Sequence, residues 1–425
     1  MLHEMDVGKA GAMGPAMARA VEACVHCGFC LAACPTYREL GQEMDSPRGR
    51  IVLMKEVMEG RLTAEAARPH VDRCLGCLAC EPACPSGVPY RDLISPYRAT
   101  VGAGAGASGW EAARRALMRW TLPYPGRFRW AARLAGVVKA FRALMPSALR
   151  PMLELVPGRL PSEVALPERT PALGERRARV ALLAGCAQQV LDPDINVATI
   201  DVLARNGVEV WVPRGQGCCG GLSWHTGDLA GARGFARRNL EAFGGAVDAV
   251  LTNAAGCGSA MQEYALMLAG TADEGRAREL AGRTMDVSVF LARLGLFERP
   301  MGWEEPVRVA YHDACHLANA QGARAEPRSL LASIPGLELV EVPDAHLCCG
   351  SAGTYNVEQP AIASSLGRQK AAAIRETGAR VVASGNIGCL TQIRLHGAGL
   401  EVRHTMQVLR DAYEGRRPGD GRAGR

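Results

Sequence analysis

The sequence predicts a mixed fold, with an α-helical N-terminal domain followed by a duplicated α/β unit. Three observations support this prediction. Eight cysteines form two matching runs before residue 90, and the sequence between the runs has helical periodicity. From residue 179 onward the chain repeats itself, with eight further cysteines at matched positions. Within each repeat, short apolar runs alternate with helical patterns, which is typical of parallel α/β layers.

Each N-terminal cysteine run reads C-x2-C-x2-C-x3-C-P, the spacing of bacterial ferredoxins that bind cubane iron–sulfur clusters. In two-cluster ferredoxins the fourth cysteine of each run ligates the other cluster. Zinc and disulfides are the alternatives, but zinc sites usually pair two C-x2-C knuckles without a trailing Cys-Pro. We therefore expect two [4Fe–4S] clusters, held by Cys24, Cys27, Cys30 and Cys84 and by Cys74, Cys77, Cys80 and Cys34.

Helical patterns lead into and connect the two cysteine runs. A short helix is expected over 12–22, and a second begins after Ser46, where Ser46 can cap and Pro47 suits the first turn. Ile51, Met54, Met58 and Leu62 mark its apolar face, and a third helix over 63–73 delivers Cys74. Residues 1–98 thus form a helical two-cluster domain. Arg48 and Arg50 could face the clusters, a partner or solvent.

Composition and charge narrow the class of protein. A length of 425 residues allows two or three domains. The formal charge of +6 is mild, and because the sequence contains no nucleic-acid motif, we expect no nucleic-acid partner. Sixteen patterned cysteines favour a cytosolic metal protein over a secreted disulfide protein. The sequence predicts neither a signal peptide nor a membrane-spanning helix, so we expect a cytoplasmic protein whose membrane role, if any, is peripheral on the inner face.

Residues 99–178 connect the two halves. The Gly- and Ala-rich stretch 99–109 is expected to be a flexible linker, and the Pro- and Arg-rich stretch 157–178 a second one. Between them, aromatic and basic residues alternate, and Glu111 is the only acid between 108 and 150. Such helices occur at membrane or partner surfaces. Irregular spacing and Pro123, Pro125 and Pro146 favour a connector that packs its aromatic residues on the next domain.

The duplicated region divides into residues 179–300 and 301–412, followed by a polar tail, 413–425, expected to be disordered. The first copy should contain strands 179–184, 208–212 and 247–252 and helices 193–206 and 230–243. The second should contain strands 307–312, 337–342 and 379–383 and helices 326–333 and 360–376. Connections between parallel strands are expected to be right-handed.

The cysteines of both copies follow the carboxyl ends of predicted strands. Because these ends share one edge of a parallel sheet, the thiols of each copy should converge there. Buried structural thiols fit eight matched cysteines poorly, and disulfides are possible but awkward in a reducing cytosol. Zinc and an iron–sulfur cluster both suit four thiolates. These thiols are Cys186, Cys218, Cys219 and Cys257, and Cys315, Cys348, Cys349 and Cys389. Nearby His225, His312, His316 and His346 are candidate ligands or proton donors.

The pattern C-xn-C-C-G-xn-C, present twice behind a two-cluster helical domain, resembles the cysteine-rich CCG-domain family. This family includes iron–sulfur subunits of heterodisulfide reductase, anaerobic glycerol-3-phosphate dehydrogenase, lactate utilisation and glycolate oxidase. Similarity is greatest to the glycolate oxidase type, through Cys34-Pro-Thr-Tyr37, Ser46-Pro-Arg-Gly-Arg-Ile51, Cys84-Pro-Ser-Gly-Val88 and His312-Asp-Ala-Cys315-His316. Members with a non-cubane cluster end each repeat with C-x-x-C, whereas here Ala260 and Gln392 replace the last cysteine.

The resemblance implies an electron-transfer subunit of a glycolate dehydrogenase. A flavin subunit containing FAD would oxidise glycolate to glyoxylate, and this chain would pass the electrons toward membrane quinone. The chain has no strand followed by G-x-G-x-x-G, so we expect it to bind no flavin or nicotinamide by that motif and to contribute no catalytic residue. Lactate or glycerol 3-phosphate could replace glycolate. A thiol–disulfide enzyme resembling heterodisulfide reductase and a zinc-containing scaffold are the rival interpretations.

Overall fold

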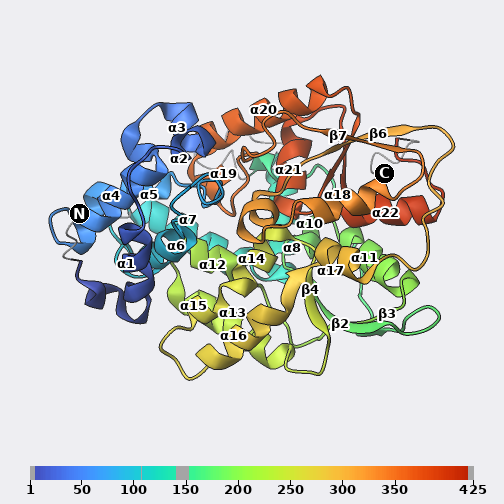
Figure 1. Ribbon diagram of the computed structural model, residues 1–425, viewed down its shortest axis with the longest axis horizontal. Helices are drawn as coiled ribbons and strands as arrows, with labels where there is room; N and C mark the ends of the chain where they lie inside the picture. Colours follow the sequence, from blue (N-terminus) through green and yellow to red (C-terminus); the bar gives the residue numbers. More distant parts are fainter. Residues whose placement is uncertain (1–4, 107, 140–152, 420–425) are drawn as a thin grey trace.

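The computed structural model describes residues 5–106, 108–139 and 153–419. Helices of the N-terminal region gather at one end of the molecule, and two parallel sheets with their covering helices form the remainder (Figure 1). The prediction of a helical domain followed by two α/β copies is confirmed. Within the described ranges, no helix combines the length and the apolar character needed to cross a bilayer.

The N-terminal region is built from short helices around the two cysteine runs. As predicted, Ser46 caps the helix that begins at Pro47, where its Oγ accepts a hydrogen bond from the Gly49 N–H at 3.0 Å. Met17, Met54, Met58 and Leu93 form the buried interior. The elements are η1 (Val7–Met13), α1 (Gly14–Glu22), α2 (Cys30–Ala33), α3 (Pro35–Leu40), η2 (Glu43–Asp45), α4 (Pro47–Met58), α5 (Ala64–Asp72) and α6 (Arg91–Ala99).

The stretch expected to be a flexible linker is held against the helical region. Helix α6 continues to Ala99, and the turns that follow fold back so that the Gly102 N–H donates to the Tyr97 carbonyl at 2.8 Å. A side chain at Gly102 would collide with the Tyr97 ring, because a Cβ there would lie 2.8 Å from it. The Arg68 guanidinium also donates to the Gly106 carbonyl. Gly102 therefore allows close packing of this turn against Tyr97.

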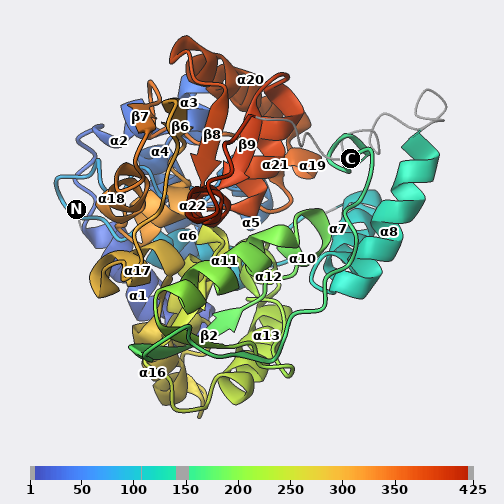
Figure 2. The same ribbon diagram turned by 90° about the vertical axis from the view of Figure 1, so that its right-hand side faces the viewer.

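Two helices follow, α7 (Gly109–Thr121) and α8 (Pro125–Val138). They lie side by side at the edge of the molecule, away from both sheets (Figure 2). The sequence favoured a connector that packs its aromatic residues inward, and this expectation was wrong for Trp110, Trp120 and Trp130, which are 54%, 50% and 61% exposed. Phe141, Arg142 and Pro146 of the same segment lie outside the described residues.

The first copy contains a five-stranded sheet of order β1-β3-β2-β4-β5, parallel except for β1. Its strands are β1 (Arg169–Thr170), β2 (Ala178–Leu183), β3 (Val208–Trp211), β4 (Ala249–Thr252) and β5 (Thr284–Asp286). Its helices are α10 (Gln188–Leu191), α11 (Asp194–Arg205), α12 (Gly221–His225), α13 (Leu229–Ala242), α14 (Ala255–Gln262), α15 (Tyr264–Met267), α16 (Glu274–Arg283) and α17 (Val287–Leu294).

The second copy contains a parallel four-stranded sheet of order β7-β6-β8-β9. Its strands are β6 (Val307–Tyr311), β7 (Leu337–Glu341), β8 (Val381–Ser384) and β9 (Glu401–His404). Its helices are η4 (His316–Ala320), α18 (Ala325–Ala332), α19 (Tyr355–Glu358), α20 (Pro360–Glu376), α21 (Ile387–His396) and α22 (Thr405–Tyr413). The edge strands β1, β5 and β9 were not predicted, whereas β2, β3 and β4 of the first copy and β6, β7 and β8 of the second lie where the apolar runs indicated.

The two copies share a continuous interior. Val180 and Val309 belong to one buried cluster, which the side chains of Trp303 and Tyr413 help to close. Across the boundary, His404 Nε2 lies 2.9 Å from the Asn253 carbonyl oxygen, and Asp194 pairs with Arg410 at 2.7 Å. The described part of the tail is also attached, since the Trp303 indole donates to the Arg416 carbonyl; residues 420–425 lie outside the described residues.

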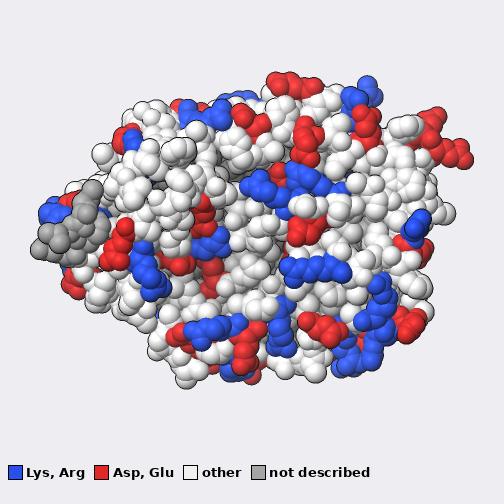
Figure 3. All heavy atoms as spheres, viewed as in Figure 1, with Lys and Arg blue, Asp and Glu red and all other residues white. Residues whose placement is uncertain are grey.

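Surface charge is mixed on the face seen in Figure 3. Lysine and arginine side chains alternate there with aspartate and glutamate over both α/β copies. Many charged groups among the described residues pair, as Arg308 does with Glu338 at 2.7 Å and Arg328 with Glu341 at 2.7 Å. Exposed pairs of this kind contribute little to stability. A surface that lacks charges, or that carries charges of one sign only, would therefore differ from this face.

Candidate metal centres

Both N-terminal cysteine runs form tightly curled loops. His26, which aligns with Gly76 of the second run, and Leu78, which aligns with Gly28 of the first, have φ angles of 56° and 58°, in the left-handed region that few residues other than glycine adopt. Gly28 and Gly76 are also left-handed, with φ angles of 89° and 64°. Such curled loops direct several thiols toward one point, as a cluster requires.

The fourth cysteine of each run lies near the other run. Burial raises the pKa of Cys24, and the neighbouring thiols of Cys84 and Cys27 raise it further. Burial likewise raises the pKa of Cys80, with Cys77, Cys74 and Cys34 adding to the effect. Cys84 therefore lies near Cys24 of the first run, and Cys34 lies near Cys77 and Cys80 of the second run as well as near Cys30 of its own. This arrangement suits the crossed ligand sets that we expect from the spacing.

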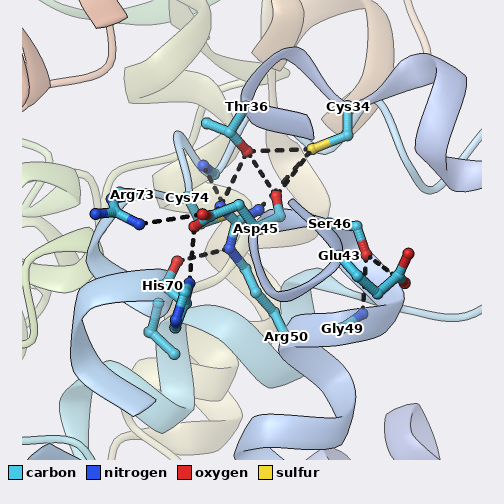
Figure 4. A network of polar contacts seen from close by, with 12 residues as sticks. Cys34, Thr36, Glu43, Asp45, Ser46, Gly49, Arg50, His70, Arg73 and Cys74 are labelled. Atoms are coloured by element: carbon cyan, nitrogen blue, oxygen red, sulfur yellow. Dashed lines mark hydrogen bonds and ion pairs between the residues drawn. The ribbon is translucent and has the colours of Figure 1, made fainter. Parts of the chain in front are cut away.

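A buried polar network surrounds Cys34 (Figure 4). The Arg50 side chain is 1% exposed, and its guanidinium donates to the Thr36 hydroxyl at 2.9 Å and to the His70 carbonyl at 2.7 Å. Its Nη1 lies 3.9 Å from Cys34 Sγ. Asp45, fully buried, lies 3.5 Å from Arg50 and 3.1 Å from Arg73. The solvent-facing interpretation of Arg50 was therefore wrong.

Arg50 also acts on the second cysteine run. Burial alone would raise the pKa of the Cys74 thiol, but the guanidinium groups of Arg50 and Arg98 hold it below its usual value. Arg48 plays a smaller part at the first run, where it donates to the His26 carbonyl at 3.0 Å and pairs with Glu43 at 2.6 Å. Arg50 and Arg98 thus place positive charge beside the buried Cys74 thiol of the second run, where it stabilises the thiolate.

The four thiols of the first copy converge as predicted from the strand ends. Cys186 Sγ lies 3.6 Å from Cys218 Sγ. Hydrogen bonds with Cys186 and Cys219 raise the pKa of Cys218, whereas hydrogen bonds from Cys218 and Cys257 lower the pKa of Cys219. The thiols therefore form a continuous set with Cys219 at its centre. Cys257 lies in the first turn of α14 rather than in a loop.

The second copy repeats this arrangement. Cys315 Sγ lies 4.0 Å from Cys348 Sγ, and hydrogen bonds from Cys348 and Cys389 lower the pKa of Cys349. Thiolates bound to one tetrahedral zinc ion at 2.3 Å are about 3.8 Å apart, which is close to the Cys186–Cys218 and Cys315–Cys348 separations. Among the described residues, no three thiols of either copy lie within 4.8 Å of one another, so it is the chemistry of the four thiols, rather than their spacing, that suits a zinc ion or an iron–sulfur cluster. The donor set of each copy therefore fits a metal centre.

One imidazole distinguishes the second copy from the first. His312, 1% exposed, lies with Cys349 and Cys389 so that the three ligand atoms are within 4.8 Å of one another. Neither of its ring nitrogens has a hydrogen-bond partner among the described residues. The corresponding position in the first copy is Leu183, because Arg308-Val-Ala-Tyr-His aligns with Arg179-Val-Ala-Leu-Leu. The second copy thus offers five donors and the first copy four.

A glycine follows each cysteine pair for a conformational reason. Gly220 and Gly350 have φ angles of 79° and 88°. A Cβ at Gly350 would lie 2.5 Å from the Ala363 carbonyl oxygen, so a larger residue would be excluded even if the backbone could adopt this angle. The turn also allows the N–H of Gly220 to donate to Cys218 Sγ at 3.5 Å. Backbone donors of this kind stabilise thiolates.

The N-terminal region contacts the second copy close to its thiols. Asn319 donates to the Cys77 carbonyl at 3.0 Å, and the Tyr355 hydroxyl donates to the Arg73 carbonyl at 2.9 Å. Cys315 is close enough to Cys77 to raise its pKa, after the larger effect of burial. The second cysteine run is therefore adjacent to the second four-thiol site, as electron transfer between them requires.

A cavity of about 600 Å³ connects several of these groups. Cys74, Cys186 and Cys315 contribute to its wall, and Met118 of α7 and Phe128 of α8 line it from the other side. Of the predicted histidines, His225 and His316 also line it, with ring centres 5.4 Å apart. Burial lowers the pKa of His225 to about 3 and that of His316 to about 4, so both rings are neutral at pH 7. His346, the remaining candidate, does not line this cavity.

Two polar residues near the thiols were not anticipated from the sequence. Asp45 is the buried acid of the Arg50 network, and Asn386 donates to Cys389 Sγ at 3.3 Å. Asp45 occurs in a loop with no repeated pattern. The position in the first copy that corresponds to Asn386 is occupied by Ala254, just before α14. A comparison of the two copies therefore does not identify Asn386 as a functional residue.

Comparisons with known proteins agree with this structure. Residues 20–88 match the family described as a 4Fe-4S dicluster domain, and residues 180–262 and 309–394 match the family described as a cysteine-rich domain. The fold and its thiol sites therefore define an iron–sulfur protein made of a dicluster domain and a duplicated cysteine-rich domain.

Individual relatives cover nearly the whole chain. The glycolate oxidase iron-sulfur subunit of Escherichia coli (strain K12) is 37% identical over 93% of this chain and 94% of its own length. The probable glycolate oxidase iron-sulfur subunit of Bacillus subtilis (strain 168) is 36% identical over 88% of each. Lactate utilization protein A of Oceanobacillus iheyensis is 30% identical over 56% of this chain. The chain belongs to the family of glycolate oxidase iron–sulfur subunits.

Proposed function

We propose that this chain is the electron-transfer subunit of a glycolate dehydrogenase, which accepts electrons from an FAD subunit and passes them toward membrane quinone. The observation that carries the proposal is the series of thiol sites, which leads from an exposed loop through the second cysteine run to Cys315. The ligand sets expected from the spacing, Cys24, Cys27, Cys30 and Cys84, and Cys74, Cys77, Cys80 and Cys34, would hold two [4Fe–4S] clusters. When bound, these clusters supply one-electron carriers.

The first cysteine run is where we expect the flavin subunit to dock. Cys27 is exposed, and Phe29, which follows it, is 67% exposed. An exposed aromatic residue beside a redox centre is well placed as an interface anchor. Arg48 holds the same loop from within through the His26 carbonyl. Electrons would therefore enter at the first cluster and leave toward the interior.

Replacing Phe29 with aspartate should slow glycolate-dependent reduction of the clusters by at least about tenfold, because a charge would replace a buried anchor in the complex. Iron content and reduction by dithionite should not change. Stopped-flow absorbance with the reconstituted flavin subunit measures the rate. The matched control is Phe297→Asp, since Phe297 is 69% exposed on another surface. Equal rates for Phe29→Asp and the unsubstituted chain would exclude this docking site.

The cavity beside the four-thiol sites is where electrons would leave. Its lining by Met118, Phe128 and Ala132 suits a lipophilic quinone, and the neutral rings of His225 and His316 lie in the same wall. Reduction of a quinone also consumes protons, and a neutral imidazole can hold or pass a proton at its ring nitrogens. We place the complex on the inner face of the membrane, with this chain cytoplasmic.

Purifying the tagged chain anaerobically from its native cells with its partners tests the function directly. We expect a flavin protein to accompany it and glycolate to bleach the iron–sulfur absorbance, whereas D-lactate, L-lactate and glycerol 3-phosphate should not. Bleaching by lactate instead would favour the role suggested by the lactate utilization relatives and reject glycolate. Bleaching by none of the four, without a flavin protein, would favour thiol–disulfide chemistry.

Metal analysis of the same preparation decides what the duplicated region binds. Iron and sulfide beyond two four-iron clusters would indicate a further cluster, and zinc would indicate one thiolate-bound ion per site. Zinc in both copies, together with an absence of any substrate-dependent reduction, would favour the scaffold interpretation. Cys219→Ser, which removes the central thiol of the first copy, assigns the metal to that site.

A further inference from the structure

Helix α7 presents its charged residues to the protein and its apolar residues to the outside. The exposed residues of this helix are glycine, alanine, leucine and tryptophan only, including Trp110, Ala113, Leu117 and Trp120. An amphipathic surface helix of a globular protein has the opposite orientation. The apolar side of α7 therefore forms an outer surface that a further apolar phase would cover.

The charged residues of α7 make their polar contacts on the inner side of the helix. Arg115 pairs with Asp72 at 3.0 Å and with Glu358 at 3.0 Å. Glu111 pairs with Arg68 at 2.9 Å, and this hydrogen bond lowers the pKa of Glu111 to about 2. Because these contacts tie the helix to α5 and α19, its orientation is fixed by ion pairs, and the exposed apolar side does not result from a loosely placed helix.

Helix α8 extends the same surface and adds positive charge. Trp130, Leu134 and Val137 recur at helical spacing and are 50–68% exposed, and Arg133 is exposed beside them. Arg127 lies over the rings of Trp120 and Tyr124, 5.0 Å and 4.3 Å from their centres. Residues 112–139 include no aspartate or glutamate. This differs from the mixed charge seen on the face in Figure 3.

We propose that the outer faces of α7 and α8 form a docking surface for an anionic lipid bilayer. Tryptophan and tyrosine favour the interface between headgroups and hydrocarbon, and arginine without neighbouring acids is attracted to anionic headgroups. Glu111 is the one acid of α7 and α8, and it pairs with Arg68, so the described residues of these helices offer no free acidic group to a basic protein partner. The inference rests on the proposed membrane-linked function and assigns that role to a defined surface.

The position of the surface fits this role. The inner sides of the same helices line the cavity that reaches Cys74, Cys186 and Cys315, through Met118 and Phe128. With α7 and α8 on the bilayer, the lipid phase and the thiol sites would lie on opposite sides of one layer of helices. A lipophilic acceptor would then have a short path from the membrane to the redox centres.

Vesicle binding by the purified, cluster-containing full chain tests the proposal. We expect flotation with phosphatidylcholine vesicles that contain phosphatidylglycerol, weaker binding at high salt, and little binding to phosphatidylcholine alone. Trp120→Glu with Trp130→Glu should weaken binding by at least about tenfold. The control pair is Leu173→Glu with Phe297→Glu, which are 54% and 69% exposed elsewhere. Unchanged iron content in all variants would establish that they fold.

Three outcomes would overturn the docking surface: no binding to either vesicle, equal binding to neutral vesicles, or retained binding by the double tryptophan variant. Loss of the flavin subunit from the tryptophan variant, with no vesicle binding by the unsubstituted chain, would instead identify a protein interface. Reduction of the clusters by glycolate in detergent-free solution is measured separately. A failure of membrane docking can therefore be told apart from a failure of the electron-transfer function.

Discussion

Replacing Cys34 with serine removes the iron–sulfur cluster of the second cysteine run and leaves that of its own run in place. We expect this result because Cys34 lies with Cys77, Cys74 and Cys80, where its thiol raises the pKa of Cys80. Serine provides a weaker ligand, so the cluster should be lost or converted to a three-iron form, and the iron of the N-terminal domain should fall by up to half.

Comparison with two unambiguous variants makes this result decisive. Electron paramagnetic resonance of reduced Cys34→Ser should match that of Cys77→Ser and differ from that of Cys27→Ser. The reciprocal variant, Cys84→Ser, should match Cys27→Ser, because Cys84 lies beside Cys24. If instead the spectrum of Cys34→Ser matched that of Cys27→Ser, and the spectrum of Cys84→Ser matched that of Cys77→Ser, the crossed ligand sets would be wrong. Each loop would then hold its cluster alone.

Replacing Arg50 with glutamine should have two large effects. The first is a loss of folding stability of about 3–5 kcal/mol, because Asp45 is fully buried and would keep only Arg73 and His70 as partners. The second is a fall in the reduction potential of the second cluster by at least ~60 mV, since a cation near Cys34 and Cys74 is removed. Anaerobic denaturation and a redox titration followed by electron paramagnetic resonance measure them.

Two further variants separate charge from packing at this site. Arg50→Lys keeps the charge but loses the planar hydrogen bonds to Thr36 and His70, so we expect reduced stability with a nearly unchanged potential. Arg48→Gln, two residues earlier on the same helix, should leave the second cluster unaffected, because Arg48 contacts the first loop. An unchanged potential in Arg50→Gln would show that the guanidinium does not act on the cluster.

Local sequence patterns were sufficient to predict the central architecture. The cysteine spacing, the Ser46-Pro47 helix start and the apolar runs of β2, β4, β6 and β8 are short-range signals whose physical cause lies within a few residues. The edge strands β1, β5 and β9 were not predicted because they are short and carry polar side chains at most of their positions, so they form no apolar run. Their pairing depends on neighbours distant in sequence, which a single-chain pattern does not reveal.

The sequence was sufficient to predict which thiols form each site, but not which other residues surround those thiols. Each set of cysteines follows the carboxyl ends of predicted strands. Because these ends lie at one edge of a parallel sheet, the sequence predicted that the thiols of each set converge there. The buried Asp45–Arg50 pair, the unpaired His312 and the reversed orientation of α7 arise from tertiary contacts. In α7 the aromatic residues suggested an inward face, yet ion pairs with Asp72 and Glu358 determine which side turns inward.

The duplication within one chain has a consequence for the two four-thiol sites. Two identical subunits related by a twofold axis would carry the same residue at corresponding positions, and their centres would be equivalent. Covalent fusion removes that constraint, and the copies differ where Leu183 in one corresponds to His312 in the other. Two metal centres that have different donor sets also have different energies. If both sites bind redox-active clusters, an asymmetric pair can impose a downhill order on electron flow that a symmetric dimer could not.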